Sequence, residues 1–474
     1  MGLTKATFPT TRRPPKVKSS KAEINAPVHT LPELRFGDES LTSYAGAVVL
    51  QALFQRLELK KRLRGCFAHL SQGQIVGYHR VCLILVMHIM LGFRRLRDID
   101  RYRDDPVASR AVGLRRMPHV STVSRALGRM DNRAADRLGN LSRELVLGRL
   151  ERERLARVTL DFDGSVVSSG RFAEGLAVGY NKGKKGMRSY YPLLCTVAQN
   201  AQVLDILHRP GNVHDSNGAP AFMENCIGAV RAHLPHAVIE SRMDSAFFSD
   251  TTVSLLDGAA VEFTISVPFE RFAELKEVIE SRKRWNRLSP EWSVFEISWS
   301  PHSWESHYRL LVFRHRVRHQ NKEPIQLNLF VPVEEGFEFK AIITNKTRSE
   351  KNILAFHNGR GSQENIFSEL KSQCQMDYVP TRRLAGNRVY FLSTILAHNL
   401  FRELQMACTR PIRFSFRKRP ALWVFPEAQT IRQHVLHRAG RLTNHHGRLR
   451  LTLSGNRITA EEFARYLSGL GKAA

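Results

Sequence analysis

The stretch that decides the fold of this chain is HNGRGSQENIFSELK, residues 357–371. If it is helical, Arg360, Glu364 and Lys371 recur at spacings of four and seven and lie on one face. The helix is predicted to begin at Ser362, a good N-cap residue that follows two glycines. The apolar positions predicted to face a core are Ile366, Phe367 and Leu370. One carboxylate therefore stands between two cations, and we interpret it as a ligand of a divalent metal ion.

The composition predicts a large protein with a polyanionic partner. The 474 residues are enough for several domains, and 72 Lys and Arg against 44 Asp and Glu give a net charge of +28. Nucleic acid is the default partner of so basic a chain. The six cysteines form no C-x-x-C pair, which argues against zinc and disulfides and fits a reducing cytoplasm. The apolar run at 81–92 is shorter than the roughly 20 residues that span a bilayer, so no membrane partner is expected.

The predicted fold class is α/β, with a catalytic domain split by a β-rich insertion and flanked by helical DNA-binding regions. The expected parts are a disordered basic arm at 1–41, a helical DNA-binding domain at 42–150, catalytic segments at 151–268 and 340–410 around an insertion at 269–339, and a basic C-terminal region at 411–474. The arm either contacts DNA phosphates or is a solvated tail.

One short helix in the first domain is a candidate for DNA contact. It is expected over 122–130 with Ser121 as N-cap, and it exposes Arg125 and Arg129. A short basic helix behind a polar turn resembles the second helix of a helix-turn-helix. A purely structural helix is the alternative.

A change of pattern marks the start of the catalytic segment. Residues 157–167 (RVTLDFDGSVV) alternate as a strand that carries Asp161 and Asp163. Further strands are expected near 191–198, 203–208, 237–243 and 261–267, with helices at 216–234 and 249–257. This order resembles the ribonuclease H-like nucleotidyltransferase fold. In that fold the first and fourth strands are neighbours, so Asp163 and Asp244, at the ends of these strands, would meet.

The chemistry that these carboxylates suit is phosphodiester cleavage. Two Mg²⁺ ions about 3.5–4 Å apart activate the attacking oxygen and stabilise the leaving one. Mg²⁺ prefers hard oxygen ligands, and Mn²⁺ is expected to substitute for it. The candidate catalytic and metal-binding residues are Asp163, Asp244 and Glu364. Asp161 and Glu369 remain rivals; Asp163 is preferred because it sits nearer the polar end of its strand. Each candidate also has a structural alternative. Asp163 could be a turn residue, Asp244 the N-cap of the next helix, and Glu364 part of an i,i+4 ion pair.

Together the motifs resemble the bacterial insertion-sequence DDE transposases, in the cut-and-paste group with the YREK pattern. That pattern is Tyr, two residues, Arg, three residues, Glu, six residues, Lys. It reads here as His357, Arg360, Glu364 and Lys371, with His in place of Tyr. LDFDGSVV and RMDSAFF resemble the two aspartate motifs, and the likeness covers roughly 160–404.

The resemblance implies binding of terminal inverted repeats, cleavage, and strand transfer into target double-stranded DNA. It implies a homodimer in the synaptic complex, working in the bacterial cytoplasm at the nucleoid. Arg360 and Lys371 would contact DNA near the cut, and His357 would donate to a phosphate. Phosphate contacts are also predicted for Lys182, Lys184, Lys185 and Arg188. The alternative is that these residues form a solvated loop. The alternatives to a transposase are a nuclease or resolvase without strand transfer and a non-catalytic DNA-binding protein.

Three tryptophans of the insertion have two possible roles. The resemblance makes them candidates for stacking a flipped DNA base, whereas tryptophans on alternating strands are more often part of a core. These residues are Trp292, Trp299 and Trp304.

Overall fold

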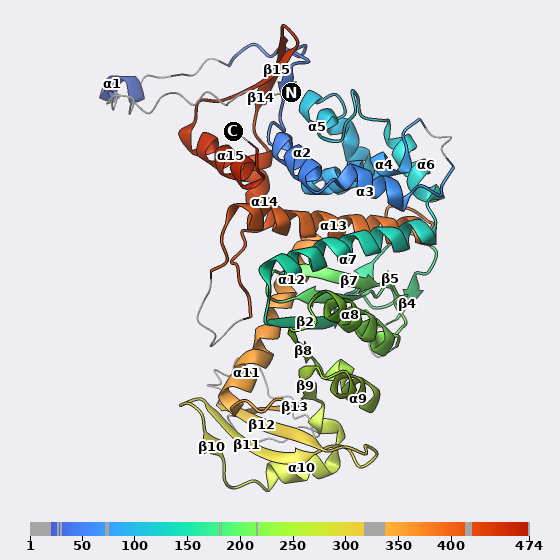
Figure 1. The fold of residues 1–474 in the computed structure, drawn as a ribbon, viewed down its shortest axis with the longest axis vertical. Coiled ribbons are helices and arrows are strands. Elements are labelled where there is room, and N and C mark those ends of the chain that lie inside the picture. The colour runs from blue at the N-terminus through green and yellow to red at the C-terminus, as the bar shows by residue number, and fades with distance from the viewer. Residues whose placement is uncertain are drawn as a thin grey trace.

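The computed structural model describes residues 20–25, 28, 31–71, 75–179, 181, 183–214, 217–316, 337–412 and 420–472. Most of the predicted basic arm, Lys182 and part of the predicted insertion fall outside these ranges. The described part is elongated, with helices at one end and the strands of the insertion at the other (Figure 1). None of its helices combines the length and the apolar character needed to cross a membrane.

A nine-stranded sheet of order β10-β11-β12-β13-β9-β8-β2-β6-β7 forms the centre of the molecule. β2 (Arg157–Gly164), β6 (Leu193–Val197) and β7 (Gln202–Leu207) make an antiparallel meander. β8 (Val238–Met243) pairs with β2 in parallel, and β9 (Glu262–Val267) pairs with β8 in parallel. The expectation that the first and fourth strands are neighbours is therefore confirmed.

Both faces of the sheet are covered at β2, which is buried along most of its length. On one face Leu160 and Phe162 join a core with α8 (Ala219–His233) and α9 (Asp250–Gly258). On the other face Asp161 forms an ion pair with Arg242. Since side chains alternate along a strand, Asp163 lies on the same face as Asp161.

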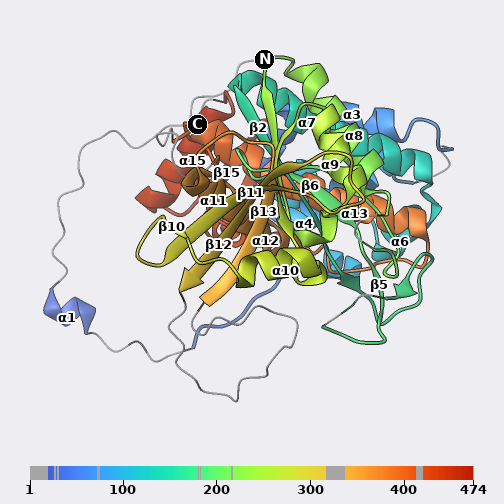
Figure 2. The same cartoon turned by 90° about the horizontal axis from the view of Figure 1, so that it is seen from below.

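The insertion extends this sheet and does not form a separate β-unit. β11 (Trp292–Trp299), β12 (Tyr308–Arg316) and β13 (Phe337–Thr344) are antiparallel neighbours, and β13 pairs with β9. α10 (Ala273–Glu280) lies along them in the view of Figure 2, and its apolar residues pack against this part of the core. The short β10 (Asn286–Arg287) forms the edge. The boundary expected between 339 and 340 falls inside β13.

The insertion tryptophans pack against other aromatic side chains. The Phe248 ring stacks on Trp299 and Trp304 with centroids 6.4 and 4.9 Å apart, and both indoles border the core. Trp292 stacks on His315 with centroids 4.5 Å apart. These contacts favour the core alternative for the three tryptophans.

The N-terminal and C-terminal regions pack into one helical body. Its main helices are α2 (Ala47–Arg56), α3 (Leu59–Cys66), α4 (Tyr78–Met90), α6 (Val120–Arg129), α7 (Asn132–Glu153), α13 (Leu384–Cys408) and α15 (Arg457–Gly469). α4 and α13 are apolar on most sides and share one core with the others. A small sheet also joins the two regions, since β1 (Leu41–Thr42) pairs with β14 (Gly440–His445).

The remaining elements are short. They are α1 (Lys21–Ile24), η1 (Leu96–Arg101), α5 (Pro106–Ala111), η2 (Ser245–Phe247), η3 (Phe269–Arg271), α14 (Ala428–Ile431), the π-helical η5 (Arg432–Leu436) and β15 (Arg448–Leu453), which pairs with β14. A second small sheet of order β3-β5-β4 comprises β3 (Val167–Ser168), β4 (Ala177–Val178) and β5 (Arg188–Tyr190).

Two predicted N-cap residues, Ser121 and Ser362, are wrong. α6 begins at Val120, and its cap is His119, whose Nδ1 accepts from the Ser121 N–H. The stretch at 357–371 is the continuation of α11 (Glu350–Asn358) through η4 (Gly359–Gly361) into α12 (Ser362–Ser372). Because the chain is already helical before it, Ser362 caps nothing, and its hydroxyl donates to the Gly359 carbonyl. The predicted burial of Ile366, Phe367 and Leu370 is confirmed.

Candidate active site

Two of the predicted carboxylates meet at one edge of the large sheet. Asp163 is the penultimate residue of β2 and Asp244 directly follows β8, and these strands are parallel neighbours. Asp163 Oδ1 accepts from the Gly164 N–H at 2.8 Å, and Asp244 Oδ1 accepts from the Ala246 N–H at 3.0 Å. Asp244 is therefore the N-cap of η2, as its alternative interpretation supposed. These backbone contacts fix the orientation of both carboxylates.

The guanidinium of Arg360 lies against both carboxylates. Its Nη1 is 3.4 Å from Asp163 Oδ2 and 3.8 Å from Asp244 Oδ2. All three side chains are only partly exposed, at 23% for Arg360, 24% for Asp163 and 33% for Asp244. In each aspartate, one carboxylate oxygen accepts a hydrogen bond from a backbone N–H and the other faces the Arg360 guanidinium.

A buried ion pair holds the helix that carries Arg360. The Arg242 guanidinium donates to both oxygens of Asp161, at 2.7 and 2.5 Å, and also to the Phe356 carbonyl at 3.0 Å. Arg242 passes so close to Gly359 that a Cβ there would lie 2.3 Å from its Nη1. Any larger residue at this point of η4 would therefore push the Arg242 guanidinium out of its place.

A second tether joins α12 to β2, because the Gln363 side-chain amide donates to the Asp161 carbonyl at 2.9 Å. Together the two tethers place Arg360, between Gly359 and Gln363, at the end of the sheet. Sequence reasoning missed Arg242 and Gln363. The only available signal was a cation two residues before Asp244, on the same face of its strand.

The two rival carboxylates are occupied by structural ion pairs. Asp161 is 1% exposed and is held by Arg242, which is fully buried. Glu369 pairs with the buried Arg402 and accepts from the Ala428 N–H at 3.0 Å. Both rival carboxylates are therefore already engaged by buried arginines.

Glu364 lies apart from the aspartate pair. It is exposed on the first turn of α12, four residues after Arg360. Among the described residues we find no hydrogen bond or ion pair of its carboxylate. In the same ranges no three His, Cys, Asp or Glu side chains converge closely enough to hold a metal ion. The expected three-carboxylate cluster is therefore not assembled here, and only Asp163 and Asp244 come together.

Lys371 lies near the site, whereas His357 does not face it. Burial lowers the pKa of Lys371, and the nearby Asp377 and Asp163 carboxylates act in the opposite direction. His357 is 2% exposed, with Nε2 hydrogen-bonded to Ser266 Oγ and Nδ1 to Thr264 Oγ1. Burial lowers its pKa well below the usual value, so the ring is neutral. The expected phosphate contact of His357 does not fit this arrangement, because both ring nitrogens are already engaged.

The predicted basic loop borders the same edge of the sheet. β3 follows β2 closely and pairs with β5, so this small sheet stands beyond Asp163. Arg188 is exposed on β5, and Lys184 and Lys185 are exposed on the loop before it. The Arg188 guanidinium lies 5.3 Å from the centre of the Phe172 ring. Lys182 lies outside the described residues.

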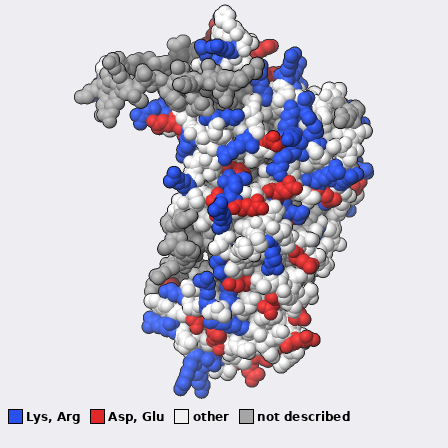
Figure 3. Space-filling model, in the orientation of Figure 1, with Lys and Arg blue, Asp and Glu red and all other residues white. Residues whose placement is uncertain are grey.

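The other predicted DNA contacts lie in the helical body. Arg125 and Arg129 are exposed on α6, and Arg125 Nε donates to the Ser121 carbonyl at 3.2 Å. In Figure 3, Lys and Arg side chains gather over the N-terminal helices at the upper right. This basic surface suits a polyanion.

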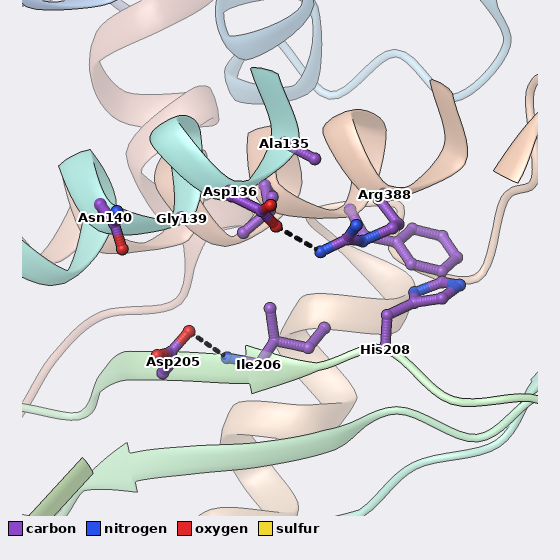
Figure 4. Close-up of a pocket in the computed structure, with 10 residues that line it drawn as sticks. Ala135, Asp136, Gly139, Asn140, Asp205, Ile206, His208 and Arg388 are labelled. Carbon is purple, nitrogen blue, oxygen red and sulfur yellow. Dashed lines mark hydrogen bonds and ion pairs between the residues drawn. The ribbon is translucent and has the colours of Figure 1, made fainter. Parts of the chain in front are cut away.

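A separate cavity of about 270 Å³ lies between α7, β7 and α13, and Figure 4 shows its lining. Asp136 and Arg388 form an ion pair of 2.7 Å at its wall. His208 has no hydrogen bond to either ring nitrogen within the described residues, and burial lowers its pKa to about 3. No predicted site residue lines this cavity, so it is distinct from the aspartate pair.

Two comparisons with known proteins gave matches, and the family model among them shows the family of the chain. A solved structure titled as a piggyBac transposase synaptic complex with hairpin DNA matches at 12% identity and a TM-score of 0.38, covering 76% of this chain and 74% of that one. No curated protein matches the sequence. The family model described as transposase DDE domain group 1 matches residues 32–474. The predicted DDE transposase is thereby confirmed: the chain belongs to the transposase DDE domain group 1 family.

Proposed function

We propose that this protein is an insertion-sequence transposase with a ribonuclease H-like catalytic domain. It binds the terminal inverted repeats of its element, cleaves the DNA strands with divalent metal, and joins the 3′-hydroxyl ends to target DNA. The observation that supports this most is the pairing of Asp163 and Asp244 at the ends of two adjacent parallel strands. Each of these carboxylates points one oxygen at the Arg360 guanidinium.

The residues at this site suit a divalent ion. Two carboxylates already surround a cationic group, and carboxylate oxygens are the ligands that Mg²⁺ and Mn²⁺ prefer. Asp163 and Asp244 would hold the metal, with Glu364 as the third ligand once α12 presents it. Two such ions would stabilise both the attacking and the leaving oxygens of the phosphodiester.

The basic residues around the site bind and orient the DNA. Arg360 and Lys371 neutralise phosphate next to the cut, and a guanidinium does this with two parallel hydrogen bonds. The exposed Lys184, Lys185 and Arg188 contact the backbone further along, with Lys182 from the same loop. The α6 residues Arg125 and Arg129 contact DNA beyond the catalytic domain. A homodimer would bring two ends together at the nucleoid of a bacterial cell.

The test is cleavage and strand transfer on duplexes of the DNA ends that bracket the gene. Asp163→Asn, Asp244→Asn and Glu364→Gln should each keep end binding and lose cleavage and joining by at least about a hundredfold, because each removes a metal ligand. Glu461→Gln, which changes an exposed carboxylate on α15, is the matched control and should act like the unmodified protein.

Two results would contradict parts of the proposal. Cleavage by Glu364→Gln at the unmodified rate would remove Glu364 from the catalytic set. Cleavage without joining of pre-cut ends would identify a nuclease in place of a transposase.

A further inference from the structure

The position of Arg360 has a consequence for metal binding. Its Nη1 lies between Asp163 Oδ2 and Asp244 Oδ2, the oxygens that face away from the backbone amides. Two carboxylates this close repel each other unless a cation stands between them. In the protein without DNA, the guanidinium supplies that cation.

A metal ion and Arg360 therefore compete for the same oxygens. Oxygen ligands of Mg²⁺ lie about 2.0–2.1 Å from the ion, which leaves no room for a guanidinium nitrogen in the same gap. Two other cations, Lys340 and Lys371, lie near this point. Burial lowers the pKa of both lysines, and the charge of Arg360 lowers the pKa of Lys340 further. A metal ion that enters while Arg360 stays would be repelled by the guanidinium charge.

DNA offers Arg360 another anion. A phosphate at the site accepts two parallel hydrogen bonds from a guanidinium, a stronger arrangement than the single long contact to each aspartate. The backbone on either side of η4 is held in place, because Arg242 ties the turn before it to β8 and Gln363 ties the turn after it to β2. The exchange therefore needs only the side chain of Arg360 to move. The arginine side chain is partly exposed, so an incoming phosphate can reach it.

We propose that Arg360 is an exchangeable cation that couples metal binding to DNA binding. It neutralises Asp163 and Asp244 until a DNA phosphate draws it away, and the two carboxylates then take up divalent metal. This inference rests on the proposed function, since it places the scissile phosphate beside the aspartate pair. Linkage is reciprocal, so DNA raises metal affinity by the same factor by which metal raises DNA affinity.

The test is Mn²⁺ binding to the full-length protein, measured by electron paramagnetic resonance of the free ion. It is run with and without a duplex of the element's end that carries a phosphorothioate at the cleaved position, which slows cleavage and keeps the negative charge. The variants are Arg360→Gln and Arg360→Lys, with Arg457→Gln on α15 as a matched exposed control.

The expected results follow from removal of the competing cation. Without DNA, Arg360→Gln should bind Mn²⁺ about tenfold more tightly than the unmodified protein, and Arg360→Lys should lie between them. DNA should raise the Mn²⁺ affinity of the unmodified protein and of Arg457→Gln about 5- to 100-fold, but that of Arg360→Gln hardly at all.

Equal Mn²⁺ affinities of Arg360→Gln and the unmodified protein would overturn the inference, as would an undiminished effect of DNA in the variant. An Asp163→Asn arm separates this failure from that of the proposed function. If Asp163→Asn still binds Mn²⁺ normally, the metal site itself is wrong. If Asp163→Asn loses Mn²⁺ while Arg360→Gln changes nothing, the coupling alone is wrong.

Discussion

Replacement of Arg242 by methionine tests whether a buried ion pair supports the site. Arg242 is fully buried and Asp161 is 1% exposed, so the variant leaves a carboxylate without its partner in the interior. Loss of one member of such a pair costs about 3–5 kcal/mol. The carbonyl of Phe356 also loses its donor, which adds to the cost.

The assay is thermal unfolding followed by circular dichroism. At about 2 °C per kcal/mol, which suits a large domain, the melting temperature of Arg242→Met should fall by about 6–10 °C. Asp163→Asn is the matched control: Asp163 is partly exposed, so a change of about 2 °C or less is expected.

A double variant decides whether the loss comes from the unpaired charge. Asp161→Asn combined with Arg242→Met removes both charges and should recover at least half of the lost melting temperature. The reasoning is refuted if Arg242→Met melts within about 2 °C of the unmodified protein, or if the double variant is the less stable of the two.

Two further predictions concern the backbone of η4 and a buried histidine. Gly359→Ala should lower the melting temperature by several degrees and weaken Mn²⁺ binding, because its Cβ would lie 2.3 Å from Arg242 Nη1; Gly361→Ala, with open space around its Cβ, should do neither. His88 is fully buried and neutral, since burial lowers its pKa from 6.5 to about 4. Its lowered pKa stabilises the fold above pH 6.5, and about 3 kcal/mol should be lost as the pH falls from 6.5 to 4. His88→Gln should flatten that pH dependence in melting experiments, and an unchanged slope would contradict the assignment.

The meander and the aspartate pair could be predicted because their signals are local. Strand alternation at 157–167 and the position of Asp244 at a strand end are read directly from the sequence. Once β2 and β8 are parallel neighbours, their carboxyl ends must lie together. The burial of the apolar face of α12 follows from the same kind of periodicity.

The remaining features depend on contacts between residues far apart in the chain. Asp161 and Arg242 are 81 residues apart, so the ion pair that occupies Asp161 cannot be read from the local pattern around it. The pairing of β13 with β9 makes the insertion part of the sheet, although its strands alternate like those of an independent unit. The burial of His357 could not be predicted for a similar reason, because its partners Thr264 and Ser266 belong to β9.

The most direct test of the aspartate pair as a metal site is anomalous diffraction from crystals of the protein with Mn²⁺ and element-end DNA. The account predicts an anomalous peak within coordination distance of Asp163 Oδ2 and Asp244 Oδ2, with Glu364 turned towards it and the Arg360 side chain on a phosphate. A peak elsewhere, or Arg360 still between the two carboxylates in the presence of metal and DNA, would contradict it.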